Sequence, residues 1–307
     1  MTTPLIHLGL HRTGSTWFQT RVLDGLDGRA MNAVADRRET TERIVLPRDR
    51  DFDAAGVRTW LAERFAAAAD AGSPPILSNE RFSGNPAAGW HDAERTFHRL
   101  AEVVPDARVL LVVREPHDLM RSIWLQQVRI GHPAGIEDFL RSPESGDHRL
   151  PTPDLAFLRL DRLVDDLDAI FGRDRVLALP YELLRRDARD FLDRISTFAG
   201  FAIPSPDSNT PVFAAPSLLE AAVLRRVNLL AVRSSLHRAP PLPRLEPVGR
   251  RVAHLIGRCA TASGERRRRA RVEAIIARRL APLDLPTSNR RLAERIGVDL
   301  TELGWPC

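Results

Sequence analysis

A glycine-containing segment near the amino terminus is the first part of the chain whose residue types could do chemistry. Residues 9–16 read Gly-Leu-His-Arg-Thr-Gly-Ser-Thr, follow an apolar run and precede an apolar pattern with helical spacing. This is close to the phosphate-binding sequence GxxxxGK[ST], but Ser15 stands in the place of the lysine. A strand, turn and helix of this kind point several backbone N–H groups at one spot, so the segment predicts a site for a phosphate-like anion.

Arg12 supplies the strong positive charge of this segment. A guanidinium offers a rigid fork of donors to phosphate or sulfate oxygens and stays charged at ordinary pH. We expect Arg12 to reach a bridging or terminal oxygen of the anion rather than the β- and γ-phosphates of a bound triphosphate. The alternative is a plain strand-to-helix connection that carries a surface arginine.

A second candidate anion contact follows the most apolar run of the chain, residues 109–113. Arg114 comes directly after this run, and ligands of open α/β sheets bind beyond the carboxyl ends of strands. Ser122 lies eight residues further on, about two turns into the next predicted helix, where it can donate to the same anion. The alternative is a solvated arginine and an ordinary helix serine.

Predicted strands and helices alternate over the first 200 residues and indicate the elements that position these groups. Four apolar runs have the length of strands, namely residues 5–8, 76–78, 108–113 and 175–179. Helical patterns lie between them, including one over residues 155–171. The alternation predicts an α/β fold with a central parallel sheet flanked by helices and a P-loop-like strand-loop-helix.

The last third of the chain has only helical patterns, broken at residues 240–243 and at Gly264. We therefore expect a single domain over 1–307, with an α/β nucleotide-binding core at 1–200 and a mainly helical extension at 201–307. The run Arg266–Arg269 suggests a polyanion site, but it is better explained as the solvated first turn of a packed helix with apolar residues on its other face.

Composition excludes several classes of protein. Hydrophobic residues make up 43% and charged residues 28% of the 307 residues, as in ordinary globular proteins. No run of 18 apolar residues occurs, and residues 2–10 match a signal peptide poorly, so we expect a cytoplasmic protein with no integral membrane segment. Cys259 and Cys307 form neither a disulfide framework nor a zinc pattern.

The basic residues argue against nucleic acid as a partner. The formal net charge is +5, and all 45 basic residues are arginine. Only 6% of the residues are aromatic, and acidic residues interleave with the arginines, whereas nucleic-acid sites combine clustered charge with stacking aromatics. The sequence does not indicate an oligomeric state.

The motifs together resemble one family, the bacterial-type PAPS-dependent sulfotransferases, where PAPS is 3′-phosphoadenosine 5′-phosphosulfate. Residues 7–19 resemble the 5′-phosphosulfate loop of the family, and Arg114 with Ser122 resembles its 3′-phosphate pair. Residues 179–184, Leu-Pro-Tyr-Glu-Leu-Leu, are similar to its tyrosine-acid segment, and residues 288–300 resemble the end of bacterial members. The matches run in family order from residue 7 to about residue 305.

The resemblance implies transfer of a sulfuryl group from PAPS to a hydroxyl, or an amine, of a carbohydrate, a lipid-linked sugar or a small molecule, with release of PAP. Arg12 would neutralise the leaving phosphate, Tyr181 would lie near the adenine, and the scheme requires no metal. The implied cofactor contacts are Arg12, Thr13, Gly14, Ser15, Thr16, Trp17, Arg114, Ser122 and Tyr181.

Two residues are candidates for the catalytic base. Glu80 ends the predicted strand at 76–78, roughly where family members that act on carbohydrates place a glutamate, although an ordinary ion pair with an arginine is the alternative. His11 is the second candidate, because it lies in the loop and its ordinary pKa suits a base. His7 lies inside the strand and is interpreted as a core histidine. Arg12 replaces the commoner lysine of the family and acts as a fixed charge.

Two other functions are compatible with the same motifs. A P-loop kinase or NTPase would bind ATP with magnesium, but Ser15 replaces its lysine and no strand-end aspartate is apparent for the metal. A non-catalytic nucleotide-binding module of the same fold would bind the nucleotide without turnover.

Overall fold

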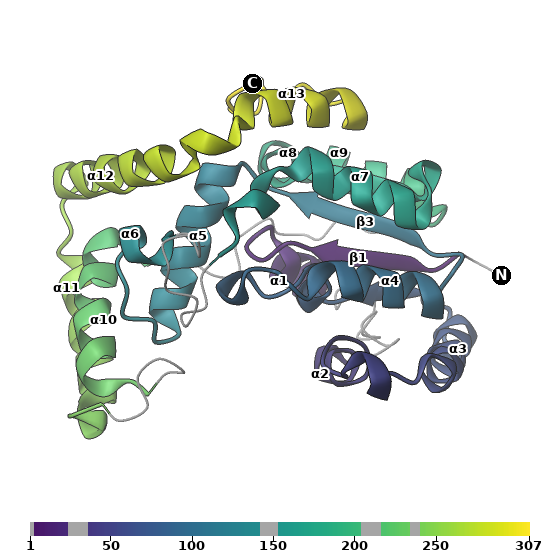
Figure 1. Cartoon of the computed structure of the whole chain (residues 1–307), viewed down its shortest axis with the longest axis horizontal. Helices are drawn as coiled ribbons and strands as arrows, with labels where there is room; N and C mark the ends of the chain where they lie inside the picture. Colours follow the sequence, from purple (N-terminus) through teal and green to yellow (C-terminus); the bar gives the residue numbers. More distant parts are fainter. Residues whose placement is uncertain (1–2, 24–35, 142–152, 204–215, 234–239) are drawn as a thin grey trace.

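A four-stranded parallel sheet forms the centre of the computed structural model, which describes residues 3–23, 36–141, 153–203, 216–233 and 240–307 (Figure 1). The strand order is β2-β1-β3-β4, and all three pairings are parallel. The strands are β1 Leu5–Gly9, β2 Ile76–Ser78, β3 Arg108–Val113 and β4 Val176–Pro180. The predicted α/β class with a central parallel sheet is confirmed.

Helices cover both faces of this sheet, because its strands are apolar on both sides. In β3, Val109, Leu111 and Val113 belong to one buried cluster, whereas Leu110 and Val112 belong to the other. This alternation follows from the two-residue period of a strand, and continuous apolar runs are typical of parallel sheets that are buried on both faces.

The helices of the first 200 residues follow the strands in chain order, and α8 and α9 come after the last strand. They are α1 Ser15–Trp17, α2 Arg37–Thr40, α3 Ala54–Asp70, α4 Ala93–Val103, α5 Pro116–Arg129, α6 Ile136–Phe139, α7 Leu160–Phe171, α8 Tyr181–Arg186 and α9 Ala188–Ala199. Shorter 3-10 and π turns are η1 Phe18–Leu23, η3 Thr41–Val45, η4 Asp49–Asp51, η5 Glu80–Ser83, η6 Pro86–Ala88, η8 Leu155–Leu158 and η9 Arg173–Arg175.

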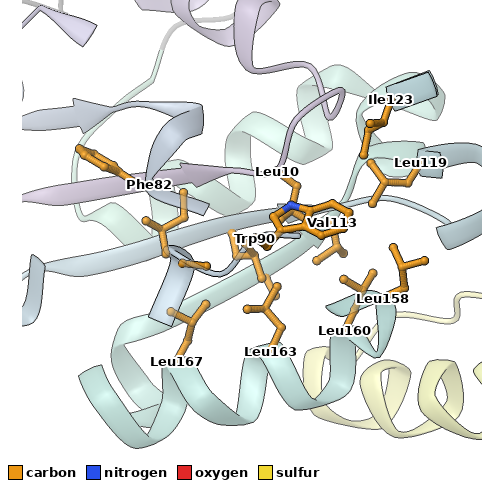
Figure 2. Packing of buried hydrophobic residues seen from close by; sticks show 14 of the residues in the cluster. Leu10, Phe82, Trp90, Val113, Leu119, Ile123, Leu158, Leu160, Leu163 and Leu167 are labelled. Atoms are coloured by element: carbon orange, nitrogen blue, oxygen red, sulfur yellow. The ribbon is translucent and has the colours of Figure 1, made fainter. Parts of the chain in front are cut away.

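The larger cluster packs α3, α4, α5 and α7 against the sheet. Figure 2 shows Leu163 of α7 pointing toward Trp90, and Leu160 and Leu167 project from the same side of this helix into the cluster. The ring of Trp90 stacks on Phe157, with centroids 4.6 Å apart. The smaller cluster packs η1 and α9 on the opposite face of the sheet. Burial of these side chains stabilises the sheet and its helices, and this packing fixes the position of the loop that follows β1.

The last third of the described chain is helical, as expected. It comprises α10 Leu218–Ala231, η10 Pro243–Leu245, α11 Glu246–Arg258, α12 Ala262–Leu280, η11 Ala281–Leu283 and α13 Leu285–Ile296. Arg266 and Arg267 are exposed on α12, while Val272, Ile276 and Leu280 are buried. The arginine run belongs to a packed helix and is largely solvated, as interpreted, but it lies after the first turn of that helix and not within it.

Three predicted boundaries are wrong for local reasons. Gly264 does not break the helical pattern; it lies in the first turn of α12 and donates its N–H to the capping Thr261 Oγ1 over 3.2 Å. The helix expected over residues 155–171 is divided at Arg159 into η8 and α7, because the backbone there is not helical. Arg175 ends the turn η9, so β4 begins one residue later than predicted.

No helix in the part of the chain that the structure describes is long and apolar enough to cross a membrane.

Candidate active site

The loop between β1 and α1 holds Arg12 in an unusual backbone conformation. Arg12 has φ 70° and Gly14 has φ 87°, both in the left-handed region that non-glycine residues adopt only at some cost. Thr13 Oγ1 donates to Leu10 O over 2.6 Å and closes the loop from inside. Arg114 Nη1 donates to Arg12 O over 2.9 Å, so the residue after β3 fixes the loop after β1. The parallel sheet brings these two strand ends together.

The side chain of Arg12 is oriented by α5. Its Nε donates to Ser122 Oγ over 3.0 Å, across 110 residues of sequence. Ser122 is buried on α5, whose start is capped by Glu115, which accepts from His117 N and Asp118 N. The two residues of the predicted anion pair are thus both connected to the loop after β1: Ser122 contacts Arg12 directly, and Arg114 contacts the backbone of the same loop.

Two positively charged guanidinium groups, those of Arg12 and Arg114, interact at this point, and Arg114 Nη2 has only a long ion pair with Asp118, at 3.7 Å. Burial, followed by the nearby charge of Arg114, lowers the pKa of Arg12 from its ordinary value. The Arg114 guanidinium lies over the Tyr181 ring, 5.0 Å from its centroid, and its Nε is buried with no hydrogen-bond partner among the described residues. An anion between the two arginines would relieve their repulsion and occupy the unused donor.

Ser15 occupies the place of the P-loop lysine and has a buried, unpartnered hydroxyl within the described part of the chain. It packs against the end of β1 so closely that a Cβ on Gly9 would lie 2.1 Å from Ser15 Oγ. Gly9 is therefore needed because of this close approach and not because of its backbone dihedral angles.

A Gly9→Ala variant is expected to lower the free energy of unfolding by about 1–3 kcal/mol, because the added methyl overpacks a buried contact. Urea denaturation measures this change. The double variant with Ser15→Ala removes the clashing oxygen and is expected to recover most of the loss. Equal stability of Gly9→Ala and the original chain would contradict the close approach.

Glu80 lies where β2 ends and is both an ion-pair partner and a pocket residue. Its Oε1 accepts from Arg37 Nη1 over 2.7 Å, while Oε2 is buried and has no partner among the described residues. Burial raises the pKa of Glu80, but Arg37, its own backbone N–H and His11 outweigh burial, so the pKa lies below its usual value. The ion pair therefore uses one oxygen of this carboxylate, which is ionised at neutral pH, and leaves the other oxygen without a partner in the described chain.

His11 lies beside Glu80 in the loop after β1. Its Nε2 contacts Gly84 O at 3.1 Å, and since a carbonyl oxygen only accepts, Nε2 carries the hydrogen and Nδ1 is the basic atom. Burial lowers the pKa of His11, partly opposed by Glu80, which favours the neutral ring. His7 is a core histidine as expected: burial lowers its pKa to about 4, and its Nδ1 lies 2.8 Å from Ser78 Oγ.

A cavity of ≈ 510 Å³ opens over these groups. Nine of the predicted site residues line it: His11, Arg12, Gly14, Ser15, Thr16, Trp17, Glu80, Arg114 and Tyr181. Thr13 and Ser122 do not line it, because Thr13 is buried against Leu10 and Ser122 lies behind Arg12. Arginines outnumber carboxylates along the cavity, so its electrostatic character suits an anionic ligand.

Part of the cavity wall was not predicted from the sequence. These residues are Gln126, Leu184, Arg185, Arg186, Asp187, Ala188 and Arg189. Gln126 lies one turn after Ser122 on α5, a spacing that could have indicated it. The others follow Tyr181 at the junction of α8 and α9, where the arginine content of the whole chain hides any local signal. Arg186 lies 3.5 Å from Glu302, and Arg189 lies 3.9 Å from Asp193.

Glu182 connects this part of the cavity wall to the rest of the protein by two hydrogen bonds. Its Oε1 accepts from Glu115 N over 3.2 Å, and its Oε2 accepts from Trp305 Nε1 over 3.1 Å. Burial raises the pKa of Glu182. This single carboxylate connects the segment that carries Tyr181, the start of α5 and the end of the chain.

No group of three or more His, Cys, Asp or Glu side chains within the described ranges could hold a metal ion.

Comparison with known proteins returns similarity only among solved structures. No family model matches this chain, and no curated protein matches it significantly. One similar structure is a sulfotransferase from Alicyclobacillus acidocaldarius, with 17% identity and a TM-score of 0.45, covering 75% of this chain and 93% of that one. Another is the sulfotransferase domain of the Synechococcus PCC 7002 olefin synthase, with 17% identity and a TM-score of 0.38, covering 81% and 95%. Both are sulfotransferases by name, the family that the sequence motifs resemble.

Proposed function

We propose that this protein is a PAPS-dependent sulfotransferase whose whole chain, residues 1–307, forms one sulfotransferase domain. The observation that carries the proposal is the convergence of Arg12 and Arg114 at the ends of neighbouring parallel strands. Arg12 is oriented by Ser122, and Arg114 lies over Tyr181, at one wall of a cavity with excess positive charge. Paired guanidinium groups beside an aromatic ring suit a phosphorylated nucleotide that carries a second acidic group.

The residues of this cavity suit PAPS by their chemistry. Ser15 Oγ and Arg114 Nε are buried donors without partners in the described chain, and both residues line the cavity. We assign Arg12, Thr13, Gly14, Ser15, Thr16 and Trp17 to the 5′-phosphosulfate, Arg114 and Ser122 to the 3′-phosphate, and Tyr181 to the adenine. Thr13 and Ser122 act indirectly in this assignment, since neither lines the cavity.

The proposed reaction transfers SO₃ to an acceptor hydroxyl. A new S–O bond forms to the acceptor oxygen, the S–O bond to the 5′-phosphate breaks, and that phosphate leaves as part of PAP. The acceptor proton passes to a base of the protein. Arg12 stabilises the negative charge that grows on the leaving oxygen, and because it is always charged it acts electrostatically and not as a proton donor.

Glu80 is the proposed base. Glu80 lines the same cavity as Arg12, its Oε2 has no partner among the described residues, and its lowered pKa keeps it ionised, so it can accept a proton without first losing one. Arg37 holds the other oxygen and fixes the direction of the carboxylate. His11 is the second candidate through Nδ1. The acceptor class is a carbohydrate, a lipid-linked sugar or a small molecule.

The first test is a thermal-shift titration with PAP, and separately with ATP and magnesium. A ligand that binds only the native state raises the melting temperature, by an amount that corresponds to about 2.7 kcal/mol at one hundred times Kd. We expect stabilisation by PAP and none by ATP with magnesium. Stabilisation by ATP with magnesium alone would replace the proposal by a kinase or NTPase.

Turnover separates the enzyme from a binding module of the same fold. Release of PAP from PAPS in the presence of a panel of acceptors is expected only for the enzyme. PAP binding without release across the panel would favour the non-catalytic module.

A further inference from the structure

An apolar stripe runs along the helical hairpin of α10 and α11 at one end of the molecule, away from the sheet (left in Figure 1). We define it by large apolar side chains that are between 37% and 59% exposed: Leu229, Leu230, Leu242, Leu245, Val248, Val252, Leu255 and Ile256. Isolated exposed apolar residues are common, but a contiguous row of them marks an interaction surface. The stripe lies outside the cavity described above.

The stripe is not needed to pack α11 onto the protein. Small residues at four-residue spacing, Gly249, Ala253 and Gly257, form the face of α11 that meets α10. A Cβ on Gly249 would lie 2.7 Å from Val227, and one on Gly257 would lie 2.7 Å from Glu220. The small residues of α11 therefore form the face that packs against α10. The apolar residues of the stripe recur with helical spacing on another face of α11.

Arginines without ion pairs flank the stripe. Arg244, Arg251 and Arg258 recur every seven residues beside the apolar positions of this segment, and Arg226 lies on α10; all four are exposed and have no partner in the described chain. The neighbouring carboxylates are already engaged: Glu246 pairs with Arg250 at 3.0 Å, and Glu220 lies 3.4 Å from His254. The free charge around the stripe is therefore positive only.

We propose that the α10–α11 hairpin docks on an anionic lipid surface, with the apolar stripe against the acyl boundary and the flanking arginines against phosphate headgroups. The unpaired arginines favour a lipid surface that carries negative charge. In a symmetric contact between two copies, the same stripe would meet itself and bring like charges together. A helix with an apolar face and arginines beside it is the arrangement typical of interfacial membrane binding.

The hairpin is rigidly joined to the helix that orients Arg12. Asn228 Nδ2 donates to Val128 O over 2.7 Å and to His132 O over 3.1 Å, at the end of α5. Arg250 Nη1 donates to Arg129 O over 2.8 Å. Docking would therefore hold the whole cavity at a fixed position relative to the lipid surface, whether or not the proposed function is correct.

Co-sedimentation of the full chain with lipid vesicles tests this inference. We expect binding to vesicles of phosphatidylcholine mixed with phosphatidylglycerol, weak binding to phosphatidylcholine alone, and loss of binding at high salt. Val252→Glu with Leu255→Glu, and separately Arg251→Gln with Arg258→Gln, should each weaken binding by about 10- to 30-fold.

Matched controls lie elsewhere on the surface. Leu46→Glu changes a similarly exposed apolar residue, and Arg266→Gln with Arg267→Gln changes two exposed arginines of α12. Neither should alter vesicle binding, and circular dichroism should show that all variants fold. Absence of binding, equal binding to both kinds of vesicle, or equal loss in the control variants would overturn the proposal. A dimer in sedimentation velocity that Val252→Glu with Leu255→Glu dissociates would instead make the stripe a contact between copies.

Discussion

An Arg12→Ala variant is expected to lose about three orders of magnitude in kcat/KM for sulfuryl transfer, which corresponds to about 4 kcal/mol of transition-state stabilisation. The guanidinium is half-buried near Arg114 and held by Ser122, so it is preorganised toward the growing charge. Its removal also leaves Ser122 Oγ without this donor. Initial rates of PAP release measure the loss.

Arg12→Lys separates charge from geometry. Lysine keeps the positive charge but cannot both donate to Ser122 and present a fork to the ligand, so we expect it to recover part of the activity. Arg267→Ala removes an exposed arginine from α12 and should leave the rate within twofold, a size typical of surface changes. A loss of only a few fold in Arg12→Ala would show that the leaving phosphate is stabilised elsewhere.

Glu80→Gln is expected to lower kcat by about 10²- to 10⁴-fold while PAP binding stays unchanged, because the amide keeps the shape of the carboxylate but cannot accept the proton. The exposed pair of Arg38 and Glu42 has the same 2.7 Å separation, so Glu42→Gln is a matched control and should have no effect on kcat. A small effect of Glu80→Gln together with a large effect of His11→Ala would move the base to His11.

The pH profile gives an independent readout of Glu80. Arg37 lowers the pKa of Glu80 against the raising effect of burial, so Arg37→Ala should raise that pKa. A base must be deprotonated, so the acid limb of kcat against pH should move to higher pH in Arg37→Ala. Arg38→Ala should leave the limb in place. An unchanged limb in Arg37→Ala would exclude Glu80 as the titrating base.

Patterns of neighbouring residues in the sequence were enough to predict the fold class and one wall of the site. The continuous apolar run 109–113 indicates a buried parallel strand, and the glycine-containing segment 9–16 indicates a strand-loop-helix, because both patterns depend on neighbouring residues. The rule that ligands meet the carboxyl ends of strands then placed Arg12 and Arg114 at one edge. The break at Arg159 was not predicted, and a break was wrongly expected at Gly264, because single backbone conformations and caps decide where helices begin and end.

Only the tertiary structure decided which partners these residues have. Neither the contact of Arg12 with Ser122 across 110 residues nor the pairing of one Glu80 oxygen with Arg37 has a local signal, since both depend on the register of β1, β2 and β3. The arginines after Tyr181 join the cavity because α8 and α9 turn there, and uniform arginine content conceals them in the sequence. The sequence alone determined which strand ends could bind an anion. The tertiary structure determined the direction of each hydrogen-bond donor, because the contacts that orient these side chains come from residues far away in the chain.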